Sequence, residues 1–296
     1  MSGSTQQLSR KINGARDLGG VVRSMKALAA SSVGQYERAV AALEDYLRAV
    51  ELGLVACLHE TAPALLAGST ETGKTDAIGA IVFGSDQGLV GSFNEVIVDF
   101  SVKALSEVSG RVTKIWAVGQ RAQTLLTEAA VGTVAGLEVP NSLDAITPLV
   151  GQIMLEVESA REKGDIREVR VFHNRPRISS SYEPIGRKLM PLDKIWQDKL
   201  SATPWPSKTI PQVIEGVPLV LAAFVREYLF VLLFQACAES LASENASRLA
   251  SMQRAEKNID GMLDDLNRKY HRVRQASIDE ELFDVIAGYE ALTKKT

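Results

Sequence analysis

One segment of this chain carries the complete pattern of a phosphate-binding loop. Gly68 to Thr75, with Gly73 and Lys74 at its end, satisfies G-x-x-x-x-G-K-[ST], in which backbone N–H groups surround phosphates and the hydroxyl reaches magnesium. That chemistry needs a buried strand before the loop and a helix after it. Here a helical stretch precedes the loop and the short apolar run 77–83 follows it. A polar connector explains these residues equally well, so a nucleotide hydrolase that uses this loop stays an alternative.

Other residue types that bind metals or catalyse reactions are scattered along the chain. The histidines and cysteines fall in unrelated segments without metal-ligand or C-x-x-C spacing; they are His59, His173, His271, Cys57 and Cys237. The acid pairs 264–265 and 280–281 are neighbours on a charged helix, so their carboxylates point to different sides. We therefore expect two buried, reduced thiols, no metal, no cofactor and no catalytic residue, which argues against an enzyme that acts alone.

The longest predicted element occupies the end of the chain. From Leu219 to Thr296 there is no proline and only two glycines, Gly261 and Gly288. Seam positions recur every three or four residues, which is typical of a helix that faces one partner. The seam passes through Leu241, Asn245, Leu249, Met252, Glu256, Ile259, Leu263, Leu266, Tyr270 and Val273. A helix from about 219 to 289 would be roughly 100 Å long at 1.5 Å per residue, so it needs a second helix along its side.

The beginning of the chain supplies that second helix. Apolar residues repeat at the same spacing before the first proline, Pro63; they are Leu8, Ile12, Ala15, Leu18, Val22, Met25, Ala29, Tyr36, Val40, Leu43, Leu47, Val50 and Leu54. The pair Gly19–Gly20 is expected to interrupt this helix, since an interior glycine costs about 1 kcal/mol relative to alanine. Two long helices from opposite ends of one chain are most economically paired as an antiparallel coiled coil.

Between the two helices the pattern changes to alternating strands and helices. Strands are predicted at 77–83, 112–118, 131–139, 168–173 and 178–183, and helices at 92–108, 120–130 and 143–163. Such alternation is typical of an open, Rossmann-like sheet covered by helices. The predicted fold class is therefore α/β, with this domain inserted into a coiled coil. The predicted parts are the first helix (1–67), the α/β domain (76–195), a proline-containing connector (196–216) and the closing helix (217–296).

Composition describes an ordinary globular chain of 296 residues with 46% hydrophobic and 23% charged residues and a net charge of −3. The apolar run 217–237 is interrupted by Pro218, Arg226 and Glu227, so we expect it to be buried under the α/β domain rather than to span a membrane. The first 36 residues carry five basic residues and one acid. This basic face is either solvated or meets an acidic partner, and the absence of any nucleic-acid-binding signature argues against nucleic acid.

Four passages carry a resemblance to a known family. Residues 241–252 (LASENASRLASM) and 274–288 (RQASIDEELFDVIAG) resemble the closing helix of the gamma subunit of F-type ATP synthases, with its patterns A-S-E-x-x-x-R-M-x-A-M and R-Q-A-x-I-T-x-E-I-x-E-I-V-x-G-A. Residues 23–31 (RSMKALAAS) and 85–94 (SDQGLVGSFN) resemble two further passages of that family. The resemblance spans the chain and is specific in its last fifty residues.

The resemblance implies the central-stalk rotor of an F-type ATP synthase, which couples ion flow through a membrane ring to ATP synthesis or hydrolysis. It implies as partners the alpha and beta subunits, an epsilon-type subunit and the membrane c-ring. It also implies a peripheral position on the cytoplasmic face of the plasma membrane, and a non-catalytic role. By this resemblance, Arg248, Gln275 and Glu281 match family positions that contact a beta-subunit loop. Met25 and Lys26 lie in the corresponding part of the first helix and are expected to contact the same partner.

Departures from the family pattern also occur. Asp279 stands where the family has threonine, and Pro204, Trp205 and Pro206 replace an acid-aromatic-proline segment. These changes suggest a divergent branch, such as the alternate proton- or sodium-translocating ATPases, and the coupling ion cannot be read from the rotor. A coiled-coil scaffold that binds partner helices without rotating would show the same seam. Only the motifs around Arg248 and Gln275 separate that alternative from the rotor.

Overall fold

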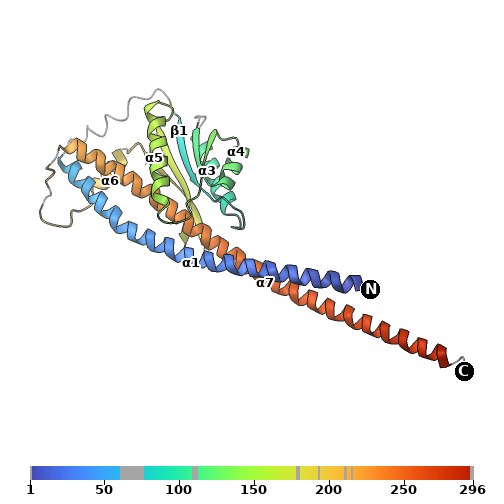
Figure 1. The fold of residues 1–296 in the computed structure, drawn as a ribbon. Helices are drawn as coiled ribbons and strands as arrows, with labels where there is room; N and C mark the ends of the chain where they lie inside the picture. The colour runs from blue at the N-terminus through green and yellow to red at the C-terminus, as the bar shows by residue number, and fades with distance from the viewer. Residues whose placement is uncertain are drawn as a thin grey trace. The chain divides into compact units, whose positions relative to one another are not determined.

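The computed structural model describes residues 2–60, 77–108, 113–177, 181–192, 194–209, 212–214 and 216–293. The phosphate-loop pattern Gly68 to Thr75 lies outside these residues. The described chain groups into two compact units, Met1–Ala29 with Leu249–Thr296 and Ala30–Arg248. Both long helices run through both units, so each unit contains a part of each helix (Figure 1).

Along the chain, a long helix precedes and another follows the strands and shorter helices of the second unit. The elements are α1 (Ser2–Glu60), β1 (Ile78–Phe83), α3 (Phe93–Ser106), β2 (Thr113–Val118), α4 (Gln120–Glu128), β3 (Thr133–Leu137), α5 (Ile146–Glu162), β4 (Glu168–Arg177), β5 (Ser181–Met190), α6 (Lys194–Ser201) and α7 (Val217–Thr293). The predicted alternation is confirmed up to β4. The last two strands are longer than predicted because they pair with each other along nearly their whole length. Helix α6 begins before the predicted connector, at Lys194, and continues into its first residues as far as Ser201.

The sheet has the strand order β3-β2-β1-β4-β5. The first four strands are parallel, and β5 is antiparallel to β4. Alternate residues of β1 face opposite sides: Ala80 and Val82 pack in a cluster with α3 and α4, whereas Ile81 and Phe83 pack in a cluster with α5 and α7. Figure 1 shows α3 and α4 on one face and α5 on the other. Both faces are buried, which explains why β1 reads as a continuous apolar run.

Within the second unit, α7 packs against the later part of α1 in antiparallel fashion. The hydroxyl of Tyr46 donates to Glu227 at 2.8 Å, and further along α1 the backbone of Gly53 lies against the ring of Phe224. A Cβ atom at residue 53 would lie 2.3 Å from that ring, so only glycine permits this approach. Both cysteines, Cys57 and Cys237, are buried and not disulfide-bonded, as predicted.

The first unit consists of the two helix ends packed side by side. Ile12, Ala15 and Ala29 of α1 and Met252 of α7 are buried, which confirms the predicted seam at these positions. Two expectations are wrong: Gly19–Gly20 does not interrupt α1, and Leu18 is exposed. A Cβ atom at residue 19 would lie 3.5 Å from Ile259. The seam therefore passes through the glycine, and packing against α7 compensates for its low helix propensity.

Helix α7 contains one 18-residue window with a mean hydropathy of 2.0, apolar enough by length and composition to cross a membrane. Only 28% of that window is buried. The predicted burial of 217–237 is confirmed from Val231 onward, where most side chains are buried. It is wrong for much of 217–230, where few are buried and Leu219 is exposed. One such helix is weak evidence for a membrane span, since an apolar core helix passes the same test.

Candidate functional site

Four of the five residues predicted to contact a partner belong to the first unit. Met25 and Lys26 lie on α1, and Gln275 and Glu281 lie near the end of α7. Lys26 is paired with Glu256, which precedes Gln275 by 19 residues on the same helix. At 1.5 Å per residue this corresponds to roughly 28 Å along the helix axis. The first unit therefore presents these residues as two separate patches.

The ammonium group of Lys26 forms an ion pair with Glu256 across the two helices. The Nζ–Oε2 distance is 2.5 Å, and the two side chains are 35% and 22% exposed. Met25 beside it is half-buried. Further along α7, the amide of Gln275 donates to Asp279 at 3.4 Å, while Glu281 is exposed. Gln275 and Glu281 are thus the more accessible pair for a partner.

The end of α7 also exposes a group of large apolar side chains. Ile278, Leu282, Phe283, Val285 and Ile286 are 45–69% exposed. Exposed apolar groups in contiguous stretches mark interaction surfaces. Gln275 and Glu281 therefore lie within an apolar stretch of helix that is suited to contact with another protein.

Arg248, the fifth predicted residue, belongs to the second unit and is largely occupied within its own helix. Its guanidinium donates to Glu244 at 2.6 Å, one helical turn earlier, and contacts Asn245 at 3.5 Å. The Arg248 side chain is 19% exposed, and that of Glu244 is nearly buried. Burial raises the pKa of the Glu244 carboxyl, and the nearby Arg248 charge opposes that rise. Arg248 thus stabilises a buried carboxylate of the chain itself.

Residues around Glu244 join α7 to the sheet where the strand order reverses. In open α/β sheets this point, at the carboxyl ends of the strands, is the usual crevice for ligands. Here the Ser243 hydroxyl donates to the carbonyl of Asn174 at 3.0 Å, and the Ser247 hydroxyl donates to the carbonyl of Val90 at 2.5 Å. The Asn174 amide donates in turn to the Phe93 carbonyl at 3.0 Å. Side chains of α7 therefore fill the crevice that a ligand would use.

The loop between β1 and α3 is held in place by its own buried polar pair. The Ser85 backbone N–H donates to the side-chain oxygen of Asn94 at 2.9 Å, and the Asn94 amide donates to the Ser85 hydroxyl at 2.8 Å. Both residues are buried. Asp86 accepts hydrogen bonds from the backbone N–H groups of Gln120 and Val139. This passage, one of the four that carry the family resemblance, thus forms an internally bonded loop that α7 contacts through Ser247.

A second buried contact joins β4 to α7. His173 Nε2 lies 2.8 Å from Glu239 Oε2, and both side chains are nearly buried. The Gln235 amide donates to the other oxygen of Glu239 at 2.9 Å. Burial lowers the pKa of the His173 imidazole, and the hydrogen bond to Glu239 opposes that change. Among the residues that the structure describes, His173 Nδ1 has no hydrogen-bond partner.

Sequence reasoning missed this joint between α7 and the sheet. It considered His173 only as a metal ligand or catalytic residue, without the spacing for either, and Glu239 lies 66 residues away from it. The available signal was polar residues inside otherwise apolar runs: His173 follows V-R-V-F, and Glu239 follows A-C-A. Buried polar groups need partners, so these positions indicate a contact, although only the fold shows which residues meet.

Comparison with protein families gives one match over nearly the whole chain, to the family described as ATP synthase, at residues 4–292. The chain is 24% identical over 294 residues to the ATP synthase gamma chain of Polynucleobacter asymbioticus, covering 98% of this chain and 99% of that one. It is 27% identical over 303 residues to the ATP synthase gamma chain of Gluconobacter oxydans, with the same coverage.

Solved structures with the same fold come from a mitochondrial ATP synthase of Euglena gracilis. A chain in the structure of its OSCP/F1/c-ring assembly superimposes with a TM-score of 0.66 at 16% identity, covering 99% of this chain and 95% of that one. A chain in the structure of the rotor of the same enzyme gives a TM-score of 0.62 at 18% identity, covering 94% and 100%. At these identities the likeness concerns the fold.

Proposed function

We propose a function from the family of this chain, which belongs to the ATP synthase family because the match covers residues 4–292. In this proposal the buried contacts between α7 and the sheet, and the exposed end of α7, each serve one function of a rotor. The chain is the central-stalk gamma subunit of an F-type ATP synthase. One task is to hold the long helix rigidly on the α/β domain, and the other is to contact the catalytic subunits.

The observation that carries this proposal is the contrast between a filled crevice and an exposed helix end. Ser243 and Ser247 of α7 occupy the strand-order switch point, so the α/β domain acts here as a seat for α7. A shaft that transmits torque must not slip on its seat, and several buried hydrogen bonds oppose such slippage. Catalysis then belongs to partner subunits, and this chain is a non-catalytic component.

The proposed partners are the alpha and beta subunits, an epsilon-type subunit and the c-ring. The Euglena gracilis structure that this fold resembles is described as an OSCP/F1/c-ring assembly, which supports a position between F1 and the ring. In the first unit, the exposed apolar side chains from Ile278 to Ile286 would lie inside the ring of alpha and beta subunits, which would remove them from water.

The finer assignments are proposals of ion and location. The coupling ion is a proton or sodium, and the departures at Asp279 and at 204–206 favour the alternate branch, whose members translocate either ion. For this chain we propose a peripheral position on the cytoplasmic face of the plasma membrane, because the relatives it matches are bacterial ATP synthase gamma chains. ATP hydrolysis by the complex, followed with and without sodium at constant ionic strength, decides between the two ions.

The test of the rotor itself is the composition of the complex that contains this chain. Gentle extraction from native membranes followed by native mass spectrometry is expected to give one copy with three copies each of two nucleotide-binding subunits and a membrane ring. A free chain, or a complex with equal copies of all subunits, would contradict the rotor and favour the coiled-coil scaffold.

The predicted contact residues need a separate test. Gln275→Leu combined with Glu281→Ala is expected to lower ATP turnover by the assembled complex and to leave subunit composition unchanged, since charge-assisted hydrogen bonds to a beta-subunit loop would be lost. Arg268→Leu combined with Asp265→Ala, which removes an exposed ion pair on the same helix, is the matched control. Equal turnover in both double variants would contradict the site assignment. Met25, Lys26 and Arg248 stay predictions of the same kind.

A further inference from the structure

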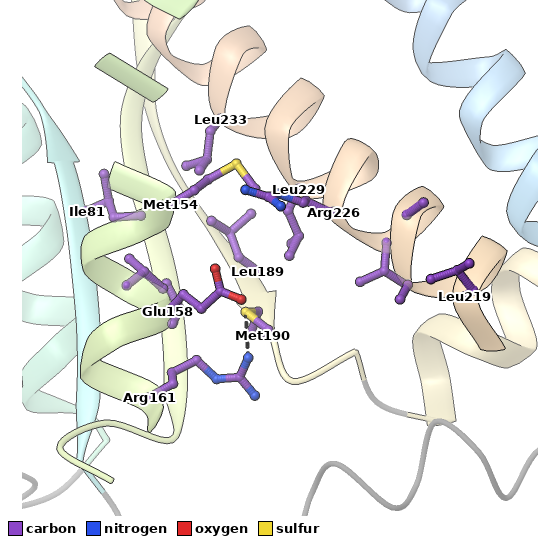
Figure 2. Close-up of a pocket in the computed structure, with 15 residues that line it drawn as sticks. Ile81, Met154, Glu158, Arg161, Leu189, Met190, Leu219, Arg226, Leu229 and Leu233 are labelled. Carbon is purple, nitrogen blue, oxygen red and sulfur yellow. Dashed lines mark hydrogen bonds between the residues drawn. The ribbon is translucent and has the colours of Figure 1, made fainter. Parts of the chain in front are cut away.

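A pocket of about 530 Å³ lies between α5, the sheet and the first turns of α7, entirely within the second unit. Figure 2 shows its walls. They are mainly apolar and come from all three layers, with Ile81, Met154, Val157, Leu189, Leu229 and Leu233 among the lining residues. Its volume and composition match those of small-molecule sites, which are mostly apolar with a few polar groups that set orientation.

The pocket exists because α7 presents small side chains there. Ala222 and Ala223 line it, and the neighbouring Leu219 is 70% exposed. This is the same part of α7 where the predicted burial fails. Exposed apolar surface of this kind gains free energy when hydrocarbon replaces water, by about 25 cal/mol per Å². An apolar occupant would therefore be favoured.

Three charged side chains give the pocket a polarity. Glu158 and Arg161 come from α5, and Arg226 comes from α7. Figure 2 shows Arg226 extending from α7 toward Met154, and the Arg161 guanidinium lying near Glu158 and Met190. With both guanidinium groups and the carboxylate charged, their formal sum is +1. A ligand with one negative charge would neutralise it.

The guanidinium groups of Arg161 and Arg226 have N–H donors available for a ligand. Arg161 Nη1 contacts the sulfur of Met190 at 3.4 Å, and a thioether is a weak acceptor. Burial lowers the pKa of Arg161, and the nearby Glu158 charge opposes that change. Within the described residues, neither Arg161 nor Arg226 forms an ion pair with a carboxylate at 4.0 Å or less. A guanidinium prefers a bidentate oxyanion, so a ligand carboxylate would suit Arg226, since Arg161 already has the Glu158 charge near it.

We propose that this pocket binds a single-chain amphiphile with one negative charge, a long-chain carboxylate. Its carboxylate lies against Arg226, because the Arg161 guanidinium lies near the Glu158 carboxylate (Figure 2), and its hydrocarbon chain lies among Val157, Leu189 and Leu229. Bound there, it bridges α5 and α7 and stabilises the seat of the long helix. The site is separate from the crevice that Ser243 and Ser247 fill, and from the exposed end of α7.

The experiment measures binding of radiolabelled dodecanoate, below its micelle concentration, to the purified full chain by equilibrium dialysis. One saturable site is expected. Arg226→Gln is expected to weaken binding about tenfold, as for loss of a hydrogen bond to a charged group. Arg48→Gln removes the same charge from an exposed side chain of α1 in the same unit, and is expected to leave binding unchanged.

A second variant tests the hydrocarbon part without touching charge. Ala223→Leu fills the pocket from α7 with a good helix former, so it is expected to weaken binding while helix content, followed by circular dichroism, stays the same. Absence of saturable binding to the full chain, equal weakening by Arg226→Gln and Arg48→Gln, or equally tight binding of dodecanol would each overturn the proposal.

The assembled complex supplies the last arm of the test. Dodecanoate is expected to bind the gently extracted complex as it binds the free chain. Binding to the free chain alone would mean that a partner subunit covers the pocket, and this would overturn the proposal for the working enzyme. Subunit stoichiometry, which tests the rotor, does not depend on any of these outcomes.

Discussion

Two stretches of one helix, α7, differ sharply in their surroundings. Residues 231–248, the embedded stretch, belong to the second unit, and most of their side chains are buried. Residues 254–287, the exposed stretch, belong to the first unit, and most of their side chains are exposed. The embedded stretch carries three polar side chains that bond to the sheet or to its adjoining loop: Glu239 to His173, Ser243 to Asn174 and Ser247 to Val90. The exposed stretch keeps only a narrow seam. A continuous helix can therefore combine a fixed base with a free surface for partners.

The largest expected contrast comes from removing the same side chain in each stretch. Leu241→Ala leaves a cavity in the embedded stretch, where Leu241 is 5% exposed, and is expected to lower the free energy of unfolding by about 2–5 kcal/mol. Leu282→Ala removes a 56% exposed side chain, and a change within about 0.5 kcal/mol is expected. Urea denaturation followed by circular dichroism measures both. Similar losses would contradict the division of α7.

A smaller effect is expected at the buried histidine contact. Glu239→Ala removes the partner of both His173 and Gln235, and an unsatisfied buried group costs about 1–3 kcal/mol. Glu280→Ala removes an exposed carboxylate from the other stretch and serves as the control, with little change expected. If the two variants melt at the same temperature, the His173–Glu239 contact does not hold α7 to the sheet.

Acidification sharpens the comparison because two buried groups of the second unit respond in opposite directions. The pKa of His173 is lowered in the folded chain, so the unfolded chain binds its proton first, and stability falls as pH falls below about 6.5. The pKa of Glu244 is raised, so this group stabilises the fold at low pH and loses that contribution as pH rises above about 4.5.

Variants separate these two contributions. His173→Gln is expected to remove the loss of stability that begins as pH falls below about 6.5, and Glu244→Gln is expected to remove the opposing gain at lower pH. Thermal unfolding measured from pH 7.5 to pH 4.5 gives both profiles. His271→Gln, an exposed histidine of the other stretch, should leave the profile of the original chain unchanged. If His271→Gln changed the pH dependence of thermal unfolding and His173→Gln did not, the titrating group would lie in the exposed stretch, and the assignment to His173 would be wrong.

The smallest effect is expected for the ion pair of the first unit. Lys26→Gln removes a partly exposed partner of Glu256, and such pairs contribute about 0–1 kcal/mol. The loss should shrink in 1 M salt, because charges are screened within about 3 Å. Lys257→Gln, an exposed neighbour of Glu256, is the control. A loss above about 2 kcal/mol that salt does not change would show that Lys26 acts through packing.

Much of the fold could be predicted because it depends on periodicity. The spacing of Ile12, Ala15 and Met252 indicated a helical seam, and the run 77–83 indicated a buried strand. Helix propensity alone could not show whether Gly19 interrupts α1, because the free-energy cost of a glycine in a helix depends on what packs against it. The extent of β4 and β5 also depended on pairing, because each strand continues as far as its partner does.

The candidate site was predictable only in part. Motifs identified Arg248, Gln275 and Glu281 as residues of interest, but the partner of Arg248 within the chain is Glu244, and its burial follows from the tertiary fold. The amphiphile pocket had no signal in the sequence, since its walls come from β1, α5, β4, β5 and α7. Residues that are distant in sequence form such a pocket only when the layers come together.

Residue spacing and local motifs within each segment are enough to predict the helices, the alternating strands and the family. The tertiary structure decided which polar residues meet, which stretch of α7 is embedded, and that helix side chains fill the crevice at the strand-order switch point. The physical reason is that hydrogen bonding and burial depend on neighbours, and those neighbours are brought together only by folding.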